Sequence, residues 1–457
     1  MPLLTWALGA LLFYAVFAAG AVDVTTWTWC VLGLGILGTL ALARRPTPAF
    51  RPLDRLSASL LAIVFALAVL QVVPVPMAWI QRLSPLRHTD LNALATLGLD
   101  IPRRAALSFV PDATRTYLLT LGAGIVSFLA VRSLASDRSP IWRLTWPLFV
   151  ITAFQAALGI FQAYTEGTDG IATGTYANRD HYAFLLEMVL PFALLYPPVI
   201  LAQDRRRFES PALPALQACV PLGVAVLLLV AIIHTLSRMG FLAALAALFV
   251  CGSMAFTLRE WRVDYEVSQM PLWRQAMPAF TVALIVFAGF IFLPTDPLIA
   301  RFSDLARTED ISADTRAQIW RDTMGLVKAS PWVGCGWGGY ESAFLRFKRV
   351  APMSTVDYAH NDYLQVLVEA GIPAFAAGLL LILRLVWRTL RSAVYATNPE
   401  QRYLAIACSG SFTAVLLHSF VDFNLYVPAN FVAFCWIAGM AGVWLRQPRA
   451  VTEGVQR

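Results

Sequence analysis

Long apolar runs recur along most of the chain, and they constrain its fold more than any other feature of the sequence. Each run spans about 17–24 residues, which allows an α-helix to cross a hydrocarbon core about 30 Å thick. The sequence therefore predicts an all-α, polytopic membrane protein of about twelve transmembrane helices. The runs lie near residues 4–20, 25–43, 56–75, 116–132, 143–163, 182–202, 213–235, 239–257, 277–293, 372–390, 403–421 and 425–445.

The composition also indicates a membrane protein. Hydrophobic residues make up 58% of the chain and charged residues 14%, whereas soluble domains are about half apolar and a quarter charged. The opening run lacks the basic start and the small-residue cleavage site of a signal peptide, so we interpret it as the first helix. The net charge of +7 reflects arginines on one side of the membrane and attraction to anionic lipids, and it makes no case for nucleic acid as a partner.

Basic residues mark one side of the predicted helices. Because cytoplasmic loops carry an excess of Lys and Arg, this side is expected to be cytoplasmic, with both chain termini inside. The segments 76–114 and 164–181, the hairpin tip at 234–240 and the long loop at 294–371 then lie outside. The arginines that define the inner side are Arg44, Arg45, Arg51, Arg55, Arg132, Arg138, Arg143, Arg205, Arg206, Arg207, Arg259, Arg262, Arg274, Arg388, Arg391 and Arg402.

A polar, aromatic and glycine-rich interruption separates the ninth and tenth predicted helices. A connection of this length is uncommon unless it carries function. We therefore expect a transmembrane bundle at 1–293, an external catalytic loop at 294–371, and C-terminal transmembrane helices with a short inner tail at 372–457. No repeat of fixed period is evident in the sequence, which argues against a repeat-built transporter.

Arg316 is placed in the first turn of a helix predicted over 315–330. Thr315 and Gln318 match a capping box at the start of this helix. A cation at this position opposes the helix macrodipole, so the arginine is better explained if an anion binds to it and to the free N–H groups nearby. The alternative is a salt bridge to a neighbouring acidic residue, which would be Asp314, Asp310 or Glu309.

Arg238 lies at the outer tip of a predicted helix hairpin, within a Ser-Arg-x-Gly sequence. An arginine at a helix end usually extends to the membrane surface. The positive-inside rule argues against an arginine on the outer side unless that arginine has a functional role. Arg238 is therefore a second candidate for anion binding. Arg179 is a third outer cation, with Asp180 beside it as a neutralising neighbour.

His360 is the loop residue suited to accept a proton from a hydroxyl group, because an imidazole ordinarily titrates near neutrality. It is expected on a second loop helix over 357–370, with Gly371 as the stop. There it would lie on a mostly apolar face turned toward the protein. Asp362 and Glu369 are candidates to orient the ring, although helix geometry places Asp362 on a different face. A structural role for the histidine is the alternative.

Other patterns in the chain are less specific. The glycines at 334–339 do not follow a strand, so they predict a tight turn packed against Trp332 and Trp337 rather than a dinucleotide site. His418 and Asp422, one helical turn apart, indicate a local hydrogen bond or a relay pair. No spacing typical of metal ligands is found, so no catalytic metal and no cofactor are expected.

The six cysteines are expected to be buried structural thiols, because most of them lie in apolar runs. Cys335, in the outer loop, is the candidate for exposure to redox chemistry. The six are Cys30, Cys219, Cys251, Cys335, Cys408 and Cys435.

Taken together, several of these motifs resemble the O-antigen ligase and O-antigen polymerase superfamily. The resemblance covers residues 220–390 most strongly, and the remaining helices match in number and topology. The family's histidine motif ends in Gly, Thr or Tyr where this chain has Ala374. The motifs are Ser237-Arg238-x-Gly240, Arg316-x-x-x-Trp320, Pro331-x-x-Gly334-x-Gly336, and His360-Asn361 followed by Gly371.

The resemblance implies a glycosyltransferase at the periplasmic face of a bacterial inner membrane. It would use a glycan on undecaprenyl diphosphate as donor and would need no metal or other cofactor. Arg238 and Arg316 match the family's diphosphate-binding arginines, and His360 matches its base. Attack from the face opposite the diphosphate would invert the anomeric centre. Further candidates for donor or acceptor contacts are Arg179, Arg321 and Asn361.

The identity of the acceptor stays open in the sequence. Lipid A core, a second lipid-linked glycan as in a polymerase, and a protein hydroxyl are all compatible with this chemistry. The lack of a large soluble C-terminal domain argues against a protein O-oligosaccharyltransferase. A flippase for the same lipid would need charges at mid-membrane depth, where the predicted helices have few. An intramembrane protease using Ser237 and His360 lacks any supporting motif.

Overall fold

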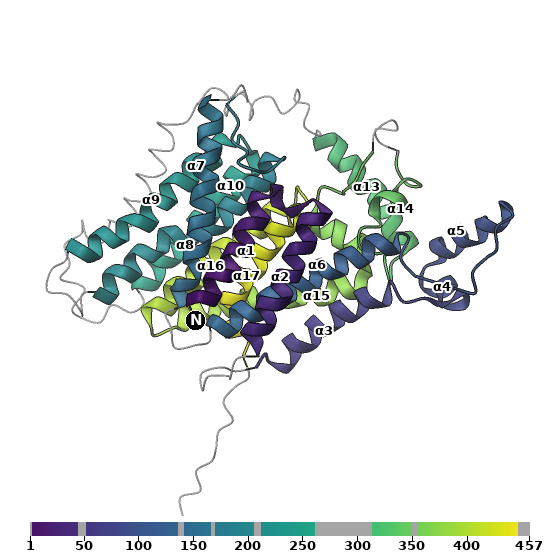
Figure 1. The fold of residues 1–457 in the computed structure, drawn as a ribbon, viewed down its shortest axis with the longest axis horizontal. Helices are drawn as coiled ribbons and strands as arrows, with labels where there is room; N and C mark the ends of the chain where they lie inside the picture. Colours follow the sequence, from purple (N-terminus) through teal and green to yellow (C-terminus); the bar gives the residue numbers. More distant parts are fainter. Residues whose placement is uncertain are drawn as a thin grey trace, which may run out of the picture.

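The computed structural model describes residues 2–43, 52–135, 141–165, 170–204, 212–260, 313–349 and 355–446. Almost all of this part of the chain is helical (Figure 1). The apolar run predicted near 277–293 and the first part of the predicted loop, 294–312, lie outside the described residues.

Every predicted apolar run within the described residues forms a helix. Long helices of this composition confirm an all-helical, polytopic membrane protein, whereas the total of about twelve stays a prediction. The helices are α1 (Pro2–Phe17), α2 (Val24–Leu42), α3 (Arg55–Leu70), α6 (Pro111–Ala135), α7 (Trp146–Thr165), α8 (Arg179–Asp204), α9 (Ala212–His234), α10 (Arg238–Glu260), α15 (Asp362–Tyr395), α16 (Pro399–His418) and α17 (Pro428–Ala441). Within the described residues, seven are long and apolar enough to cross a membrane, namely α2, α6, α7 with the preceding 3-10 helix η2 (Ile141–Thr145), α8, α9, α10 and α15.

Local capping explains where several of these helices begin. Asp54 precedes α3 in an extended conformation, and its side chain accepts a hydrogen bond from the Ser57 backbone N–H at 3.1 Å. Such a bond satisfies one of the free donors of the first helical turn. Asp54 also accepts a hydrogen bond from Arg384 of α15 at 2.8 Å, so the same carboxylate joins the start of α3 to α15.

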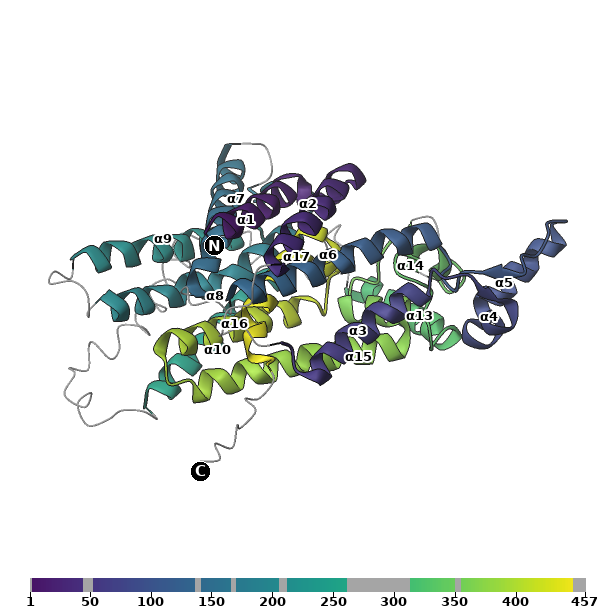
Figure 2. The ribbon, with the colours of Figure 1, turned by 60° about the horizontal axis from the view of Figure 1, so that its bottom comes forward.

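Helix α8 is central to the packing. It contacts α7, α9, α10 and α16, while α17 packs on α6 and α15 packs on α3 and α16. Large side chains fill the space between these helices, and Trp142, Trp436 and Phe192 are fully buried. Figure 2 shows the long helices lying side by side.

A smaller layer of short elements covers one end of the bundle (Figure 2). It contains α4 (Met77–Leu83), α5 (Pro85–Thr96), α13 (Ala313–Ala329), α14 (Tyr340–Phe344) and a two-stranded antiparallel pair, β1 (Val75–Pro76) and β2 (Arg104–Ala105), in which Val75 lies opposite Ala105. The two segments predicted to be outside, 76–114 and 294–371, touch directly, because the Phe109 N–H donates to the Cys335 carbonyl at 2.9 Å and Arg346 forms an ion pair with Asp90. The segments predicted to share one side of the membrane therefore lie together.

Candidate active site

His360 lies in a bend before α15, and not on a helix face. The predicted helix start near Asp357 is wrong, because Asn361 is the N-cap of α15 and its side chain accepts a hydrogen bond from the Leu364 N–H at 3.0 Å. His360 has a φ of 48°, a left-handed conformation that is uncommon outside glycine. Asn361 thus has a structural role here, and its contact with a substrate stays a prediction.

Hydrogen bonds from three directions fix the backbone around His360. The indole N–H of Trp320 in α13 donates to the Ala359 carbonyl at 2.9 Å, and the Ala359 N–H donates to the Gln365 side chain at 2.7 Å. The Asp362 N–H donates to the Ser419 carbonyl at 2.8 Å. The unusual conformation of His360 is therefore held by α13, α15 and the end of α16.

Asp422 is the carboxylate that faces His360. Its Oδ1 atom lies 3.5 Å from Nδ1 of His360, and its Oδ2 atom lies 3.7 Å from Nε2 of His181. Burial alone would raise the pKa of the Asp422 carboxyl group, but the contact with His360 and the charges of His181, His418 and His360 lower that pKa to about 2. Asp422 is therefore ionised at neutral pH and can stabilise a protonated imidazole.

The two carboxylates expected to orient His360 have other partners. Asp362 accepts hydrogen bonds from the Ser419 hydroxyl at 2.8 Å and from the Leu425 N–H at 3.4 Å. Glu369 accepts a bond from the Tyr426 hydroxyl at 2.7 Å. The expectation for these two residues is corrected, because the structure places Asp422 beside the ring instead.

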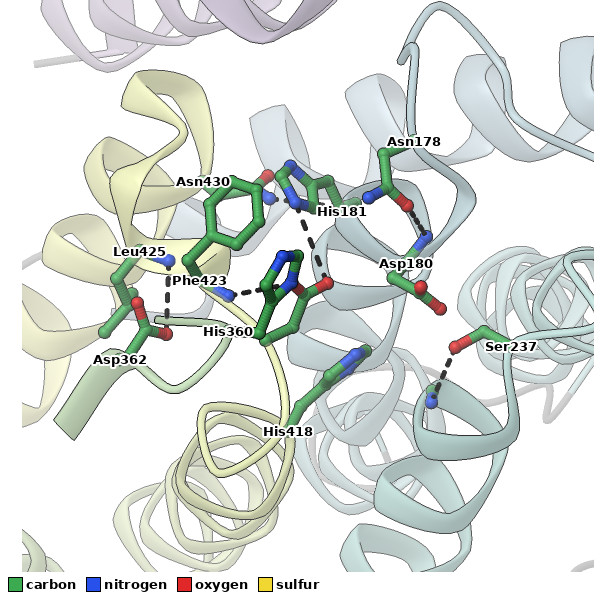
Figure 3. A network of polar contacts seen from close by, with 12 residues as sticks. Asn178, Asp180, His181, Ser237, His360, Asp362, His418, Phe423, Leu425 and Asn430 are labelled. Atoms are coloured by element: carbon green, nitrogen blue, oxygen red, sulfur yellow. Dashed lines mark hydrogen bonds and ion pairs between the residues drawn. The ribbon is translucent and has the colours of Figure 1, made fainter. Parts of the chain in front are cut away.

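His418 pairs with a residue of another helix. Its Nδ1 atom lies 2.9 Å from Oε1 of Glu187 in α8, and both side chains are buried. The local pair with Asp422 that the spacing indicated is therefore replaced by a contact that joins α16 to α8. Figure 3 shows His181, His360 and His418 in one region, with Asp180 and Ser237 nearby.

Arg238 is the first residue of α10 and lies directly after Ser237. Ser237 is buried, and its hydroxyl accepts a hydrogen bond from the Gly240 N–H at 3.0 Å, as a helix cap does. Arg238 itself is half-buried. Figure 3 shows Ser237 near the histidines, so α10, which begins at the next residue, starts at the same end of the bundle.

Arg316 lies in the first turn of α13, one turn before Trp320. Residues four apart share a helix face, so Arg316 is on the face that contacts the segment of His360 through Trp320. Arg316 is half-buried, and its Nε atom has no hydrogen-bond partner among the described residues. A guanidinium N–H enclosed in this way fits the interpretation that an anion binds there. Of the three alternative partners, Glu309 and Asp310 lie outside the described residues, and the side chain of Asp314 is not among those described either.

The start of α13 differs from the predicted one, because Thr315 lies inside the helix and not at its N-cap. The helix begins at Ala313, and the Gln318 side chain donates to Asp322 at 2.8 Å within the helix. Arg321 is exposed and donates to the Ala317 carbonyl of its own helix at 3.2 Å, so the structure does not bring it to His360. Arg179, in contrast, is the first residue of α8 and stands close to His181 in the chain.

The glycine motif forms the predicted tight turn, but against a different part of the chain. Gly334, Gly336 and Gly338 all have positive φ angles. The Gly336 N–H donates to the Glu369 carbonyl at 3.0 Å, and a Cβ atom on Gly334 would lie 2.3 Å from the same oxygen. The turn therefore packs on α15, at the point where Gly371 breaks the helix with a φ of 80°, and not on Trp332 and Trp337.

Cys335, within the same turn, is buried, so the expectation of redox exposure is wrong. Its backbone N–H donates to the Val368 carbonyl at 2.9 Å, and burial raises the pKa of the thiol well above its usual value. Cys219 is the exposed cysteine among the six.

Among the residues that the structure describes, no group of three or more His, Cys, Asp or Glu side chains has the arrangement of a metal site. Metal independence stays a prediction, which chelation can test.

A comparison with known proteins places these residues in a family. Residues 223–379 match the family described as O-Antigen ligase. This match supports the resemblance to the O-antigen ligase superfamily over that segment. The family suggests a ligase- or polymerase-type glycosyltransferase of polysaccharide biosynthesis. No curated protein matches the chain.

The O-antigen ligase match contains only part of the site. Arg238, Arg316 and His360 lie inside the matched segment, whereas His181 and Asp422 lie outside it. No sequence motif joins these two residues to His360, because they are far from it along the chain, near the start of α8 and after the end of α16. Their link to His360 becomes visible only when the helix ends meet.

Proposed function

We propose that the protein transfers a glycan from undecaprenyl diphosphate to the hydroxyl group of an acceptor. The observation that carries this proposal is the contact of the ionised Asp422 with His360, which lies inside the segment matched by the O-antigen ligase family. Two half-buried arginines lie at helix starts, since Arg238 is the first residue of α10 and Arg316 lies in the first turn of α13.

In the proposed reaction His360 acts as the base. With Nδ1 facing Asp422, Nε2 of the ring is available to accept the proton of the acceptor hydroxyl. The hydroxyl oxygen forms a bond to the anomeric carbon, and the bond from that carbon to the phosphate oxygen breaks. Asp422 stabilises the imidazolium that results, as the carboxylate of a catalytic triad does.

The leaving group is undecaprenyl diphosphate, on which negative charge develops. Guanidinium groups bind phosphate oxygens through two parallel hydrogen bonds, and donors fixed where charge develops lower the barrier. Arg238 and Arg316 are proposed to supply these donors. Attack opposite the diphosphate inverts the anomeric centre, and neither step calls for a metal ion.

The active site is proposed to face the periplasm. Helices α8, α10 and α15 begin at the end that holds His360, so their other ends lie on the opposite side. Arg259 near the end of α10, together with Arg388 and Arg391 near the end of α15, belongs to that opposite side. An excess of arginine marks the cytoplasmic side of an inner-membrane protein.

The test is a transfer assay with purified protein in nanodiscs. A defined undecaprenyl-diphosphate-linked oligosaccharide is incubated with lipid A core, with a second copy of the lipid-linked oligosaccharide, or with a Ser/Thr peptide, and products are identified by mass spectrometry. We expect a product with lipid A core, whereas chain extension of the donor would identify a polymerase.

Loss of a general base typically costs about 10²–10⁴-fold in rate, so His360→Ala should nearly abolish transfer while donor binding persists. Unchanged turnover by His360→Ala, or loss of parent activity on chelation with rescue by a divalent metal, contradicts the proposal.

A further inference from the structure

Five aromatic side chains gather beside His360, and the proposed reaction uses none of them. They come from four separate parts of the chain: α6, the glycine turn, the segment before α15, and the region that follows α16. We call this group the aromatic cluster, and its members are Tyr117, Trp337, Tyr358, Phe423 and Tyr426.

The rings form a continuous surface that ends at His360. Tyr358 stacks on Phe423 with ring centroids 4.0 Å apart and an interplanar angle of 8°. Phe423 meets the His360 ring edge to face at 5.1 Å (Figure 3). Tyr426 extends the surface on the other side, with its centroid 5.7 Å from Tyr358 and 6.3 Å from Trp337.

Partial exposure distinguishes this cluster from the core of the bundle. Tyr117, Trp337, Tyr358 and Phe423 are half-buried, whereas the core residue Trp142 is fully buried. Aromatic residues that keep part of their surface free beside a reactive group are typical of binding sites.

Polar atoms in the cluster lack the partners that a packed core would give them. The Nε1 atom of Trp337 is enclosed and has no hydrogen-bond partner among the described residues, although a buried indole N–H normally has one. The hydroxyl groups of Tyr117 and Tyr358 lie 3.4 Å apart and meet each other only weakly. The indole N–H can therefore donate to a ligand, and the two hydroxyl groups can donate to it or accept from it.

The chemistry of the cluster selects one class of ligand. A phosphate would require cations, and the five side chains carry none. A lipid tail would leave the indole N–H and the two hydroxyl groups without partners. A sugar ring satisfies both requirements, because its C–H face packs on aromatic rings while its hydroxyl groups form hydrogen bonds.

We propose that the aromatic cluster is the subsite that holds the sugar ring reacting at His360. This inference rests on the proposed function, since it takes a glycan to be the substrate. The ring belongs either to the donor glycan or to a sugar acceptor, and both present the same chemistry to the cluster. Tyr358 and Phe423 act as positioning residues, because they fix the ring relative to the base.

Equilibrium binding in nanodiscs tests the subsite with two lipids that differ only in the sugar. One is a radiolabelled undecaprenyl-diphosphate-linked oligosaccharide, and the other is bare undecaprenyl diphosphate. Tyr358→Ala should weaken binding of the glycan-bearing lipid roughly three- to tenfold, the ratio that corresponds to one aromatic contact. It should leave binding of the bare lipid unchanged. Tyr358→Phe keeps the ring and loses only the hydroxyl group, so it should weaken binding of the glycan-bearing lipid less than Tyr358→Ala does and should bind the bare lipid like the parent.

A second arm separates the two sources of the sugar. The soluble oligosaccharide released from the donor lipid is bound to the protein in the presence of bare undecaprenyl diphosphate. If the cluster holds the donor sugar, Tyr358→Ala weakens binding of the glycan-bearing lipid. If it holds the acceptor sugar, the variant weakens the soluble oligosaccharide roughly three- to tenfold instead. Either result supports the subsite.

Controls keep the outcome interpretable. Tyr395→Ala removes an exposed tyrosine at the far end of α15 and should change neither affinity. Tyr358→Leu, with its unfolding temperature measured, retains apolar bulk if the alanine variant does not fold, and it should show the same loss for the sugar. The subsite is overturned if Tyr358→Ala and Tyr358→Leu bind the two lipids and the soluble oligosaccharide as the parent does. It is also overturned if they lose affinity for both lipids equally. One further outcome separates the subsite from the proposed function. If the parent binds neither lipid, undecaprenyl diphosphate is not the carrier of the donor and the proposed function is wrong. The subsite is still supported if Tyr358→Ala then weakens binding of the soluble oligosaccharide.

Discussion

Asp422 and His360 meet across two helix ends, with Oδ1 of the carboxylate 3.5 Å from Nδ1 of the imidazole. The carboxylate also reaches toward His181, so it lies between two rings. This arrangement fixes which ring nitrogen of His360 faces the protein and leaves the other for a substrate.

We predict that Asp422→Asn lowers kcat roughly 10²–10⁴-fold, because an amide neither carries the charge that stabilises the imidazolium nor fixes the correct tautomer. Binding of the lipid-linked donor should change little. Asp357→Asn, an exposed carboxylate on the same segment as His360, is the matched control and should be active. Initial rates and donor binding measured on the same nanodisc samples check this, and a parallel loss of donor affinity would indicate a structural role for Asp422.

Arg316→Lys should reduce kcat/KM at least roughly tenfold although the positive charge is kept, because lysine lacks the planar fork that binds a diphosphate through two bonds. Arg321→Lys, on the exposed side of the same helix, should remain close to the parent. Transfer rates at matched expression distinguish the two. Near-normal turnover by Arg316→Lys would favour a structural ion pair for this residue.

The proposed orientation predicts the labelling of two introduced cysteines. Ser342 is exposed on α14, in the layer beside the site, and Thr397 is exposed between α15 and α16 at the opposite end. In a Cys219→Ser background, which removes the exposed native thiol, Ser342→Cys should react with an impermeant maleimide in spheroplasts. Thr397→Cys should react only after lysis. The reverse pattern would place the site in the cytoplasm.

Gly371→Ala should destabilise the protein, because φ is 80° at this position and a Cβ atom would lie 2.5 Å from the Trp332 carbonyl oxygen. A strained residue of this kind costs about 1–3 kcal/mol, so the thermal unfolding temperature in detergent should fall and activity with it. Gly223→Ala in α9, where no atom lies within 4 Å of the added carbon, is the control and should not be destabilised. Equal unfolding temperatures for both variants would show that the glycine turn accommodates the added methyl group without a loss of stability.

The helices could be predicted from the sequence because each apolar run carries its own length signal. The first described run, expected over 4–20, forms α1 at Pro2–Phe17, and the last, expected over 425–445, forms α17 at Pro428–Ala441. The start of α15 lies five residues after the predicted start at 357, although its signal is local. Asn361 is a favoured N-cap residue, but periodicity that extends back to Asp357 outweighed it.

The contacts of the site could be predicted only in part. Arg238, Arg316 and His360 belong to short motifs, so the sequence shows them directly. The pairing of His418 with Glu187 and of His360 with Asp422 depends on which helix ends meet. Spacing along one helix informs only about neighbours three or four residues apart, which is why His418 was paired with the wrong carboxylate.

The position of Asp422 outside the matched segment has a consequence for engineering. A chimera that moves residues 223–379 into another helical scaffold would transplant the imidazole without the counter-charge that α16 delivers to it. Such a hybrid could retain its arginines and its lipid affinity and still be inert. Exchanging substrate preference between relatives therefore requires moving the outer ends of α8 and α16 together with the loop.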